Sequence, residues 1–260
     1  MDNILNFYRH LNGNHLNKRI LEECARMLMG RYCVKKKDAY YQIVEIEFYY
    51  YGPNHRDIIT YPRTCSEKQW FFHQSGVDLT IKSNQNGEPI QFGGILIRSI
   101  RKYDRGWNYI KTICGPQKCV NELFDVLDAF DNNNNLTPVI VETTKFGDVE
   151  ICSSQRYIAF NVSKGELELQ EGRDDKEKYQ KAIKGKVETK FKTILKEYKK
   201  LVSKDGDYLE QDVNLFNSFC DYLNAEYRYY LRGIEWENGY KVAGIFNGQE
   251  QYKYLFLNRK

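Results

Sequence analysis

The run Ile43-Val44-Glu45-Ile46-Glu47-Phe48-Tyr49 has the composition of a β-strand, because β-branched and aromatic residues favour extended backbone. Side chains of a strand alternate between its two faces. The alternation gives an apolar face and a mixed face, with Val44, Ile46 and Phe48 on the first and Glu45, Glu47 and Tyr49 on the second. A carboxylate beside aromatic rings costs free energy unless it is paired, hydrogen-bonded or used in chemistry. The mixed face is therefore either a site for acid–base catalysis or a polar face that meets water.

The composition is that of a soluble protein with one domain. Its 260 residues can bury a substantial core, and we expect a single domain over residues 1–260. No run approaches the ~20 apolar residues of a membrane span. The start, Met1-Asp2-Asn3-Ile4, lacks the basic and apolar regions of a signal peptide. We therefore expect a cytoplasmic monomer with no membrane partner.

Cysteine usage and net charge limit the possible functions only weakly. The seven cysteines form no CxxC pair and have no His-rich segment near them, which argues against a disulfide framework and against a metal site. A net charge of +4 is compatible with a nucleic-acid partner but does not by itself indicate one. The 21 tyrosines suit either core packing or stacking on bases.

Hydrophobic periodicity predicts the remaining elements. Apolar residues at helical spacing predict a helix from Leu16 to Met29, with Gly30 as its C-cap, and a second helix over 120–130. Strands are expected at 31–35, 40–50, 70–73, 77–82, 93–100, 139–141, 157–162, 227–231, 240–245 and 252–257, with a weaker candidate at Ile151. The Lys- and Glu-rich stretch 173–204 predicts a long solvated helix inserted into the domain, with a nucleic-acid-contacting arm as the alternative.

Two features near the first strands indicate binding residues. The irregular loop that begins at Gly52 and continues past Arg63 is a natural carrier of such residues. Arg98 lies inside an apolar run, so its charge needs either a ligand or an ionic partner. Glu45 and Glu47 are the candidate partners.

Five segments resemble, in the same order, motifs of the alkyladenine (3-methyladenine) DNA glycosylase family. They are Ala25-Arg26-Met27-Leu28-Met29-Gly30, Ile43-Val44-Glu45-Ile46-Glu47-Phe48-Tyr49, Gly94-Ile95-Leu96-Ile97-Arg98-Ser99-Ile100, Cys114-Gly115-Pro116-Gln117-Lys118 and Arg228-Tyr229-Tyr230-Leu231-Arg232-Gly233-Ile234-Glu235-Trp236. The family has an L-L-G helix end, a V-E-T-E-A-Y strand, a V-L-I-R-A strand, a G-P-x-K-L helix start and an R-F-Y-V-R-G-x-P-W strand. The shared order covers nearly the whole chain, but the insertion 173–204 has no counterpart.

The resemblance implies a mixed α/β (α+β) single domain with a curved antiparallel β-sheet flanked by helices. It also implies a monofunctional DNA N-glycosylase that excises a damaged purine from duplex DNA with water and no cofactor. Such an enzyme flips the target base out of the duplex before cleaving its bond to the sugar. In a bacterium it would be associated with the nucleoid.

The same resemblance assigns roles to individual residues. Glu47 corresponds to the general base, Tyr49 to the ring that stacks on the flipped base, and Arg98 to an arginine that contacts the catalytic region. Lys118 and Gly115 lie at a helix start, where backbone amides and the helix dipole favour DNA phosphate.

The sequence departs from the family at the remaining positions. His55 is the nearest candidate for the active-site histidine, although Asp57 competes for that role. Trp70 would replace a second stacking tyrosine, and His73 or Phe72 would have to fill the gap left by the flipped nucleotide. Thr80 stands where the family has an asparagine that crowds out normal guanine, so base selectivity is open.

Each assignment has a structural alternative. Trp70 could be a core residue, His55 an exposed loop residue, Arg98 half of a buried ion pair and Lys118 a solvated surface lysine. Two other functions also stay open: a non-catalytic nucleic-acid-binding domain, which resembles the C-terminal RNA-binding domain of formyltransferases, and a glycosylase acting on another purine nucleotide or modified base.

Overall fold

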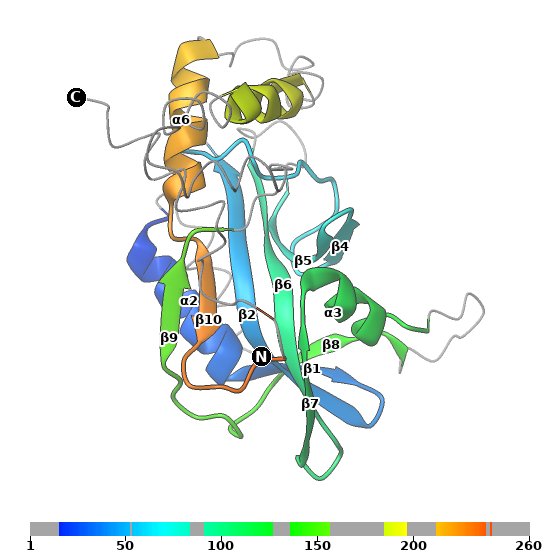
Figure 1. The fold of residues 1–260 in the computed structure, drawn as a ribbon. Coiled ribbons are helices and arrows are strands. Elements are labelled where there is room, and N and C mark those ends of the chain that lie inside the picture. The colour runs from blue at the N-terminus through cyan, green and yellow to red at the C-terminus, as the bar shows by residue number, and fades with distance from the viewer. Residues whose placement is uncertain are drawn as a thin grey trace, which may run out of the picture.

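The protein is built on one curled antiparallel sheet of ten strands (Figure 1). The computed structural model describes residues 16–52, 54–83, 91–126, 136–156, 185–196, 212–237 and 240. The strands are β1 (Tyr32–Lys36), β2 (Ala39–Gly52), β3 (His55–Arg56), β4 (Trp70–His73), β5 (Gly76–Lys82), β6 (Phe92–Tyr103), β7 (Tyr109–Cys114), β8 (Val139–Glu142), β9 (Ile151–Ser154) and β10 (Arg228–Leu231). The helices are α2 (Lys18–Gly30), α3 (Pro116–Leu123), α6 (Asp212–Asn224) and a helix at 185–196.

The two long strands β2 and β6 form the centre of the sheet. They pair over almost their full length, and the rest of the main path runs β4-β5-β6-β2-β1-β8. The second edge of β2 pairs in turn with β1, β10 and β3. The two faces expected for Ile43–Tyr49 are confirmed: Val44, Ile46 and Phe48 belong to the hydrophobic core, whereas Arg98 and the Tyr49–Glu47 hydrogen bond join Glu45, Glu47 and Tyr49 on the other face.

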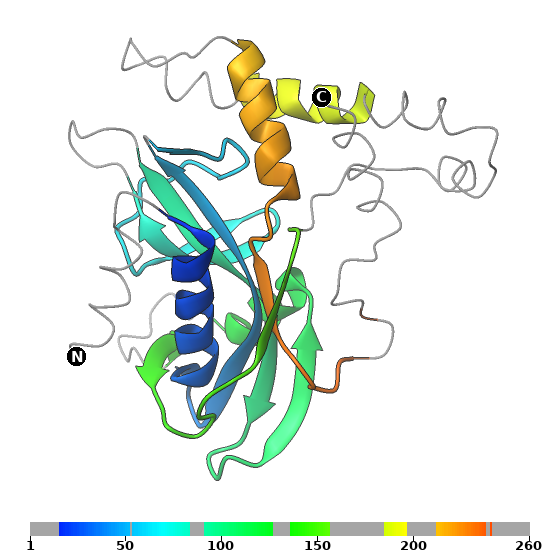
Figure 2. The same ribbon diagram turned by 90° about the vertical axis from the view of Figure 1, so that its left-hand side faces the viewer.

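Helix α2 packs on this apolar face of the sheet (Figures 1 and 2). It begins after Asn17, whose side chain accepts a hydrogen bond from the Ile20 amide at 3.0 Å, an N-cap that satisfies one free amide of the first turn. Its buried side carries Leu21, Cys24, Ala25, Leu28 and Met29. The Gln42 side chain also donates to the Met29 carbonyl, which fixes the end of the helix to β2.

Helix α3 lies on the opposite face, beside β6 and to its right in Figure 1. Gly115 precedes it with φ of 106°, a conformation that suits glycine, and Pro116 occupies the first turn. Tyr41, which shares the face of Glu45 and Glu47, donates a hydrogen bond to the Glu122 carboxylate of this helix. The mixed face of β2 is therefore covered by protein at this end.

The sheet curls until its two end strands approach each other. Strands β4 and β8 are at opposite ends of the sheet path, yet the Trp70 indole N–H donates to the Pro138 carbonyl at 2.8 Å. An apolar cavity of about 580 Å³ remains between these strands and α2, lined by residues that include Leu28, Trp70 and Ile140. The fold is thus a half-barrel around α2.

A second, smaller core joins α6 and the helix 185–196 to the far end of the sheet. Phe191, Leu215 and Phe219 of the two helices pack with Tyr51 and Phe92 of β2 and β6. No helix of the described ranges is long and apolar enough to cross a membrane.

The expected fold class is confirmed, although several elements differ in detail. The helix expected at 120–130 begins four residues earlier, at Pro116, and ends at Leu123. Helix α6 and strand β7 were not predicted. The strands expected at 157–162 and 252–257, and all but Tyr240 of 240–245, lie outside the described residues. Of the insertion 173–204, only 185–196 is described, and it is helical.

Substitution of Ile46 tests whether the apolar face of the central strand β2 contributes to the hydrophobic core. It is 0% exposed, so Ile46→Ala should lower the free energy of unfolding by about 2–5 kcal/mol through lost burial and the cavity left behind. Ile110→Ala is the matched control, because Ile110 is 50% exposed on β7 and should change stability by less than about 0.5 kcal/mol. Urea unfolding measures the free energy of unfolding of both variants, and equal losses would contradict the assignment of Ile46 to the core.

Candidate active site

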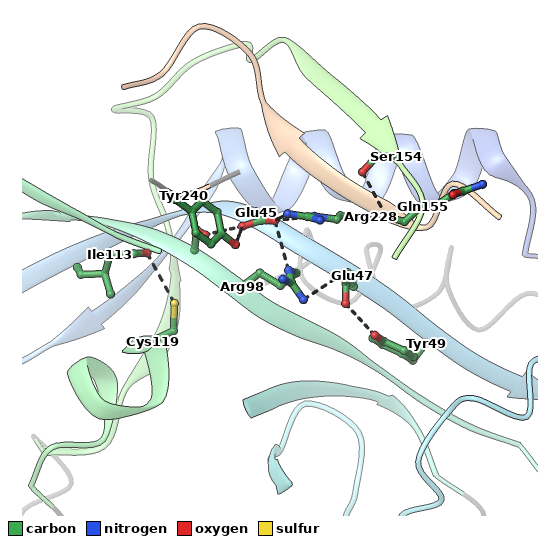
Figure 3. A network of polar contacts seen from close by, with 11 residues as sticks. Glu45, Glu47, Tyr49, Arg98, Ile113, Cys119, Ser154, Gln155, Arg228 and Tyr240 are labelled. Carbon is green, nitrogen blue, oxygen red and sulfur yellow. Dashed lines mark hydrogen bonds and ion pairs between the residues drawn. The ribbon is translucent and has the colours of Figure 1, made fainter. Parts of the chain in front are cut away.

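The centre of the mixed face is a network of buried charges (Figure 3). Glu45 and Glu47 project from β2, and Arg98 projects from β6 beside them. Arg228 of β10, directly opposite Glu47 in the register, completes the group from the other edge of β2. All four residues are buried. The carboxylates that the sequence placed among aromatic rings are therefore paired with two arginines.

The Glu45 carboxylate accepts hydrogen bonds from four residues. It accepts hydrogen bonds from Arg98 Nε at 3.3 Å, from the Ser99 hydroxyl at 2.5 Å and from the Tyr240 hydroxyl at 2.6 Å. Arg228 donates from Nε at 2.6 Å and pairs through a second nitrogen. A carboxylate offers about four lone-pair positions, so this one is saturated. Its role is to fix the arginines.

Glu47 has a different environment. Arg98 binds one of its oxygens at 3.2 Å, and the Tyr49 hydroxyl donates to the other at 2.7 Å. Burial lowers the pKa of Arg98, but Glu47 and Glu45 outweigh burial and leave that pKa above its ordinary value. Burial and the adjacent Glu47 raise the pKa of Tyr49 well above 10, so the hydroxyl stays protonated and donates a hydrogen bond to Glu47.

The ring of Tyr49 lies beside a second buried ion pair. The guanidinium of Arg156 is 4.6 Å from the ring centroid, within the range of a cation–π interaction. Arg156 is bound to Asp57 at 2.5 Å and to the carbonyls of Phe48 and Tyr222 at 3.1 and 2.9 Å. One face of the expected stacking ring is therefore occupied by a fixed cation.

Thr80 on β5 and His73 on β4 lie on the same face as Glu47, two and three strands away from β2 respectively. Residues directly opposite in an antiparallel sheet share a face, and the register places Asp78 opposite Leu96 and Leu96 opposite Glu47. His73 Nε2 is 2.9 Å from Asp78, and its Nδ1 accepts the Ser75 amide at 3.2 Å. The Thr80 hydroxyl is 3.1 Å from the Cys65 sulfur. All of these side chains are thus held by protein partners.

Trp70 is on the opposite face, which corrects the expectation that Trp70 serves with Tyr49 as a second stacking ring. The register places Trp70 opposite Leu79, Leu79 opposite Ile95 and Ile95 opposite Phe48, so Trp70 belongs to the apolar face. It lines the cavity beside α2. Alternation along β4 predicts which residues of that strand share a face with Trp70. It does not predict whether that face is the face of Glu47, because this depends on the pairing of strands that are distant in sequence.

His55 is also placed away from Glu47. It is opposite Gly52, on the side of Tyr50, and its ring lies 4.7 Å from that of Tyr222. Burial lowers its pKa to about 4, an effect that Arg156 reinforces and Asp57 opposes. His55 is therefore a neutral ring packed among tyrosines, neither an exposed loop residue nor a neighbour of the Glu47 carboxylate.

Lys118 and Gly115 are at the start of α3, as expected, and Lys118 is exposed. Its ammonium forms an ion pair with Glu237 at 2.6 Å, and this hydrogen bond raises the pKa of Lys118. Sequence reasoning assigned no role to Arg63, Asp78, Arg156, Arg228 and Tyr240, although Arg228 begins the fifth motif and Arg63 lies in the loop expected to carry binding residues. Asp78 was recognisable as a charged residue in a buried strand, whereas Arg156 follows β9 in a segment with no strong pattern.

Comparison of the chain with protein-family models, curated proteins and solved structures finds no match. Within the described ranges, no group of three or more His, Cys, Asp or Glu side chains is placed to hold a metal ion. The resemblance to the alkyladenine glycosylases therefore rests on the five ordered motifs alone.

The pKa of His55 predicts a pH-dependent loss of stability. Because the folded pKa, about 4, is below the ordinary 6.5, the unfolded chain binds more protons between these values, so stability falls as pH drops from 6.5 to 4. This residue should contribute on the order of 3 kcal/mol to that fall, at 1.36 kcal/mol for each pKa unit. Urea unfolding of the wild type and His55→Gln at both pH values measures the difference, which should be absent if His55 titrates normally.

The position of Trp70 predicts a structural role. Trp70→Ala should lower the free energy of unfolding by about 2–4 kcal/mol, since the ring is part-buried against the core, and should weaken any binding of damaged and undamaged duplexes to the same extent. Thermal unfolding and gel-shift titrations check this. A selective loss for the damaged duplex would show that Trp70 contacts the flipped base after all.

Proposed function

We propose that the chain is a monofunctional DNA N-glycosylase that releases a purine base by water attack at the sugar anomeric carbon. The observation that carries the proposal is the Glu47 carboxylate, held at one oxygen by Arg98 and at the other by the Tyr49 hydroxyl. The order of the five motifs supports it independently, because it places Glu47 and Tyr49 at the positions of the family's base and stacking ring.

The two carboxylates of β2 are suited to different tasks. Glu45, saturated by donors, orients Arg98, and Arg98 in turn orients Glu47. A carboxylate at the position of Glu47 can accept the proton of an attacking water, and its charge stabilises an oxocarbenium-like transition state. Since water is the nucleophile, the product is an abasic site in an unbroken strand.

The base must stack on the face of the Tyr49 ring that Arg156 does not occupy. Base stacking on an aromatic ring contributes about 1–3 kcal/mol and would offset part of the cost of flipping. Glu47 itself is 0% exposed, so a base reaches it only after side chains over this face move. On this proposal the partner is damaged duplex DNA, bound by a monomer inside the cell, beside the nucleoid if the cell is bacterial.

The complete burial of Glu47 favours a second candidate function. If the face never opens, the charges only hold the sheet together, and the chain is a non-catalytic nucleic-acid-binding domain of the same architecture. Such a domain binds DNA or RNA and forms no abasic product. A glycosylase acting on free purine nucleotides would instead release base without any duplex.

Glu47→Gln should abolish base release. The amide is nearly isosteric but cannot accept the proton of water, so the single-turnover rate should fall by about 10²- to 10⁴-fold. The substrate is duplex DNA treated with an alkylating agent or carrying deaminated adenine, and abasic sites are counted with an aldehyde-reactive probe. Free nucleotides are assayed in parallel.

Glu45→Gln is the matched control for structural damage. It leaves Arg228 and Arg98 without their shared carboxylate and should cost about 3–5 kcal/mol of stability, whereas in Glu47→Gln Arg98 retains Glu45 and the cost is nearer 1–3 kcal/mol. Wild-type turnover in Glu47→Gln refutes the catalytic assignment. Binding of nucleic acid with no product from any substrate identifies the chain as the binding domain.

A further inference from the structure

Arg63 is a buried cation in the loop between β3 and β4, and its guanidinium pairs with Asp78 on the Glu47 face of the sheet. Its side chain is 0% exposed. Its Nε donates to the Tyr61 carbonyl at 3.3 Å, one terminal nitrogen donates to Asp78 at 2.8 Å, and the guanidinium lies 4.5 Å from the centroid of the Phe71 ring. These contacts fix the plane of the guanidinium and the direction of each donor.

The other terminal nitrogen of Arg63, Nη1, is buried and has no hydrogen-bond partner in the described part of the chain. Asp78 cannot supply one by turning, because its second oxygen is bound to His73 Nε2 at 2.9 Å. Leaving a buried charged donor unsatisfied is costly, so such a group in a native structure calls for an explanation. A ligand acceptor is one explanation.

Nη1 is located beside the proposed stacking ring. A methyl group added to Gly94 would lie 2.1 Å from Nη1, and Gly94 is directly opposite Tyr49 in the sheet. Nη1 therefore occupies the place of the side chain that would face Tyr49, and such cross-strand neighbours are about 5 Å apart. An acceptor on the edge of a base stacked on Tyr49 would be within reach of Nη1.

We propose that Arg63 is the specificity-determining residue of this site, donating from Nη1 to the 6-oxygen of a neutral 6-oxopurine. The inference rests on the proposed glycosylase function and names its substrate class. A guanidinium is only a donor, so it matches a carbonyl oxygen and opposes the amino group of a 6-aminopurine. It also disfavours a cationic N-alkylated purine, which would add positive charge between Arg63 and Arg156.

The test compares two bases that differ by the single acceptor. Duplexes carry either deoxyinosine or its analogue with unsubstituted purine as the base, and kcat/KM for base release is measured on each. The wild type should prefer deoxyinosine by about ten-fold, the factor given by 1.4 kcal/mol. In Arg63→Lys the ammonium can still pair with Asp78 but has no second nitrogen, and the preference should fall to about one.

Arg105→Lys is the matched control, since Arg105 is 85% exposed at the β6–β7 turn and should keep the wild-type preference. Melting temperatures show whether each variant folds. A preference unchanged in folded Arg63→Lys, or absent in the wild type, overturns the inference.

A binding measurement distinguishes failure of the inference about Arg63 from failure of the proposed glycosylase function. Gel-shift affinities of the Glu47→Gln chain for the two duplexes need no turnover, and the same ten-fold preference, lost on adding Arg63→Lys, supports Arg63 even where no base is released. Equal affinities together with no release would reject both the inference and the glycosylase. If Arg63→Lys is unfolded, Arg63→Gln is used in the same comparison.

Discussion

The ion network of Glu45 with Arg98 and Arg228 is the interaction on which the rest of the site depends. It joins the three strands β2, β6 and β10 through side chains, in addition to the backbone ladders between them. Desolvating these charges is expensive, and removing one member leaves the others buried without compensation. The network therefore contributes little net stability but makes its own geometry hard to change, which is what a precisely oriented Glu47 requires.

Much of the fold could be predicted from local pattern. The alternation in Ile43–Tyr49 reflects the different chemistry of the two faces of one strand, and the helical spacing before Gly30 reflects burial on one side of a helix; the structure has both. Helix α6 was missed although Leu215, Phe219 and Leu223 recur at helical spacing. Its hydrophobic side faces a second core, which only the three-dimensional arrangement reveals.

The composition of the site could be predicted only in part, because a site is formed by strand pairing across long sequence separations. Glu47, Tyr49 and Arg98 are on strands with strong patterns and come together as expected. Trp70 and His55 were assigned by analogy with a motif, and the register places both on the opposite face. Arg156 is 108 residues from Phe48, whose carbonyl it binds, so no local signal links it to the site.

The balance of buried charge bears on what this face can accept. Four arginines, Arg63, Arg98, Arg156 and Arg228, are buried with four carboxylates, Asp57, Asp78, Glu45 and Glu47. Each arginine is paired with at least one carboxylate. A neutral base leaves this balance intact and can still satisfy an unused donor, whereas a cationic base adds one unmatched charge in a region of low dielectric constant. On the proposed function, a neutral purine with a hydrogen-bond acceptor is therefore the ligand that this arrangement of charges favours.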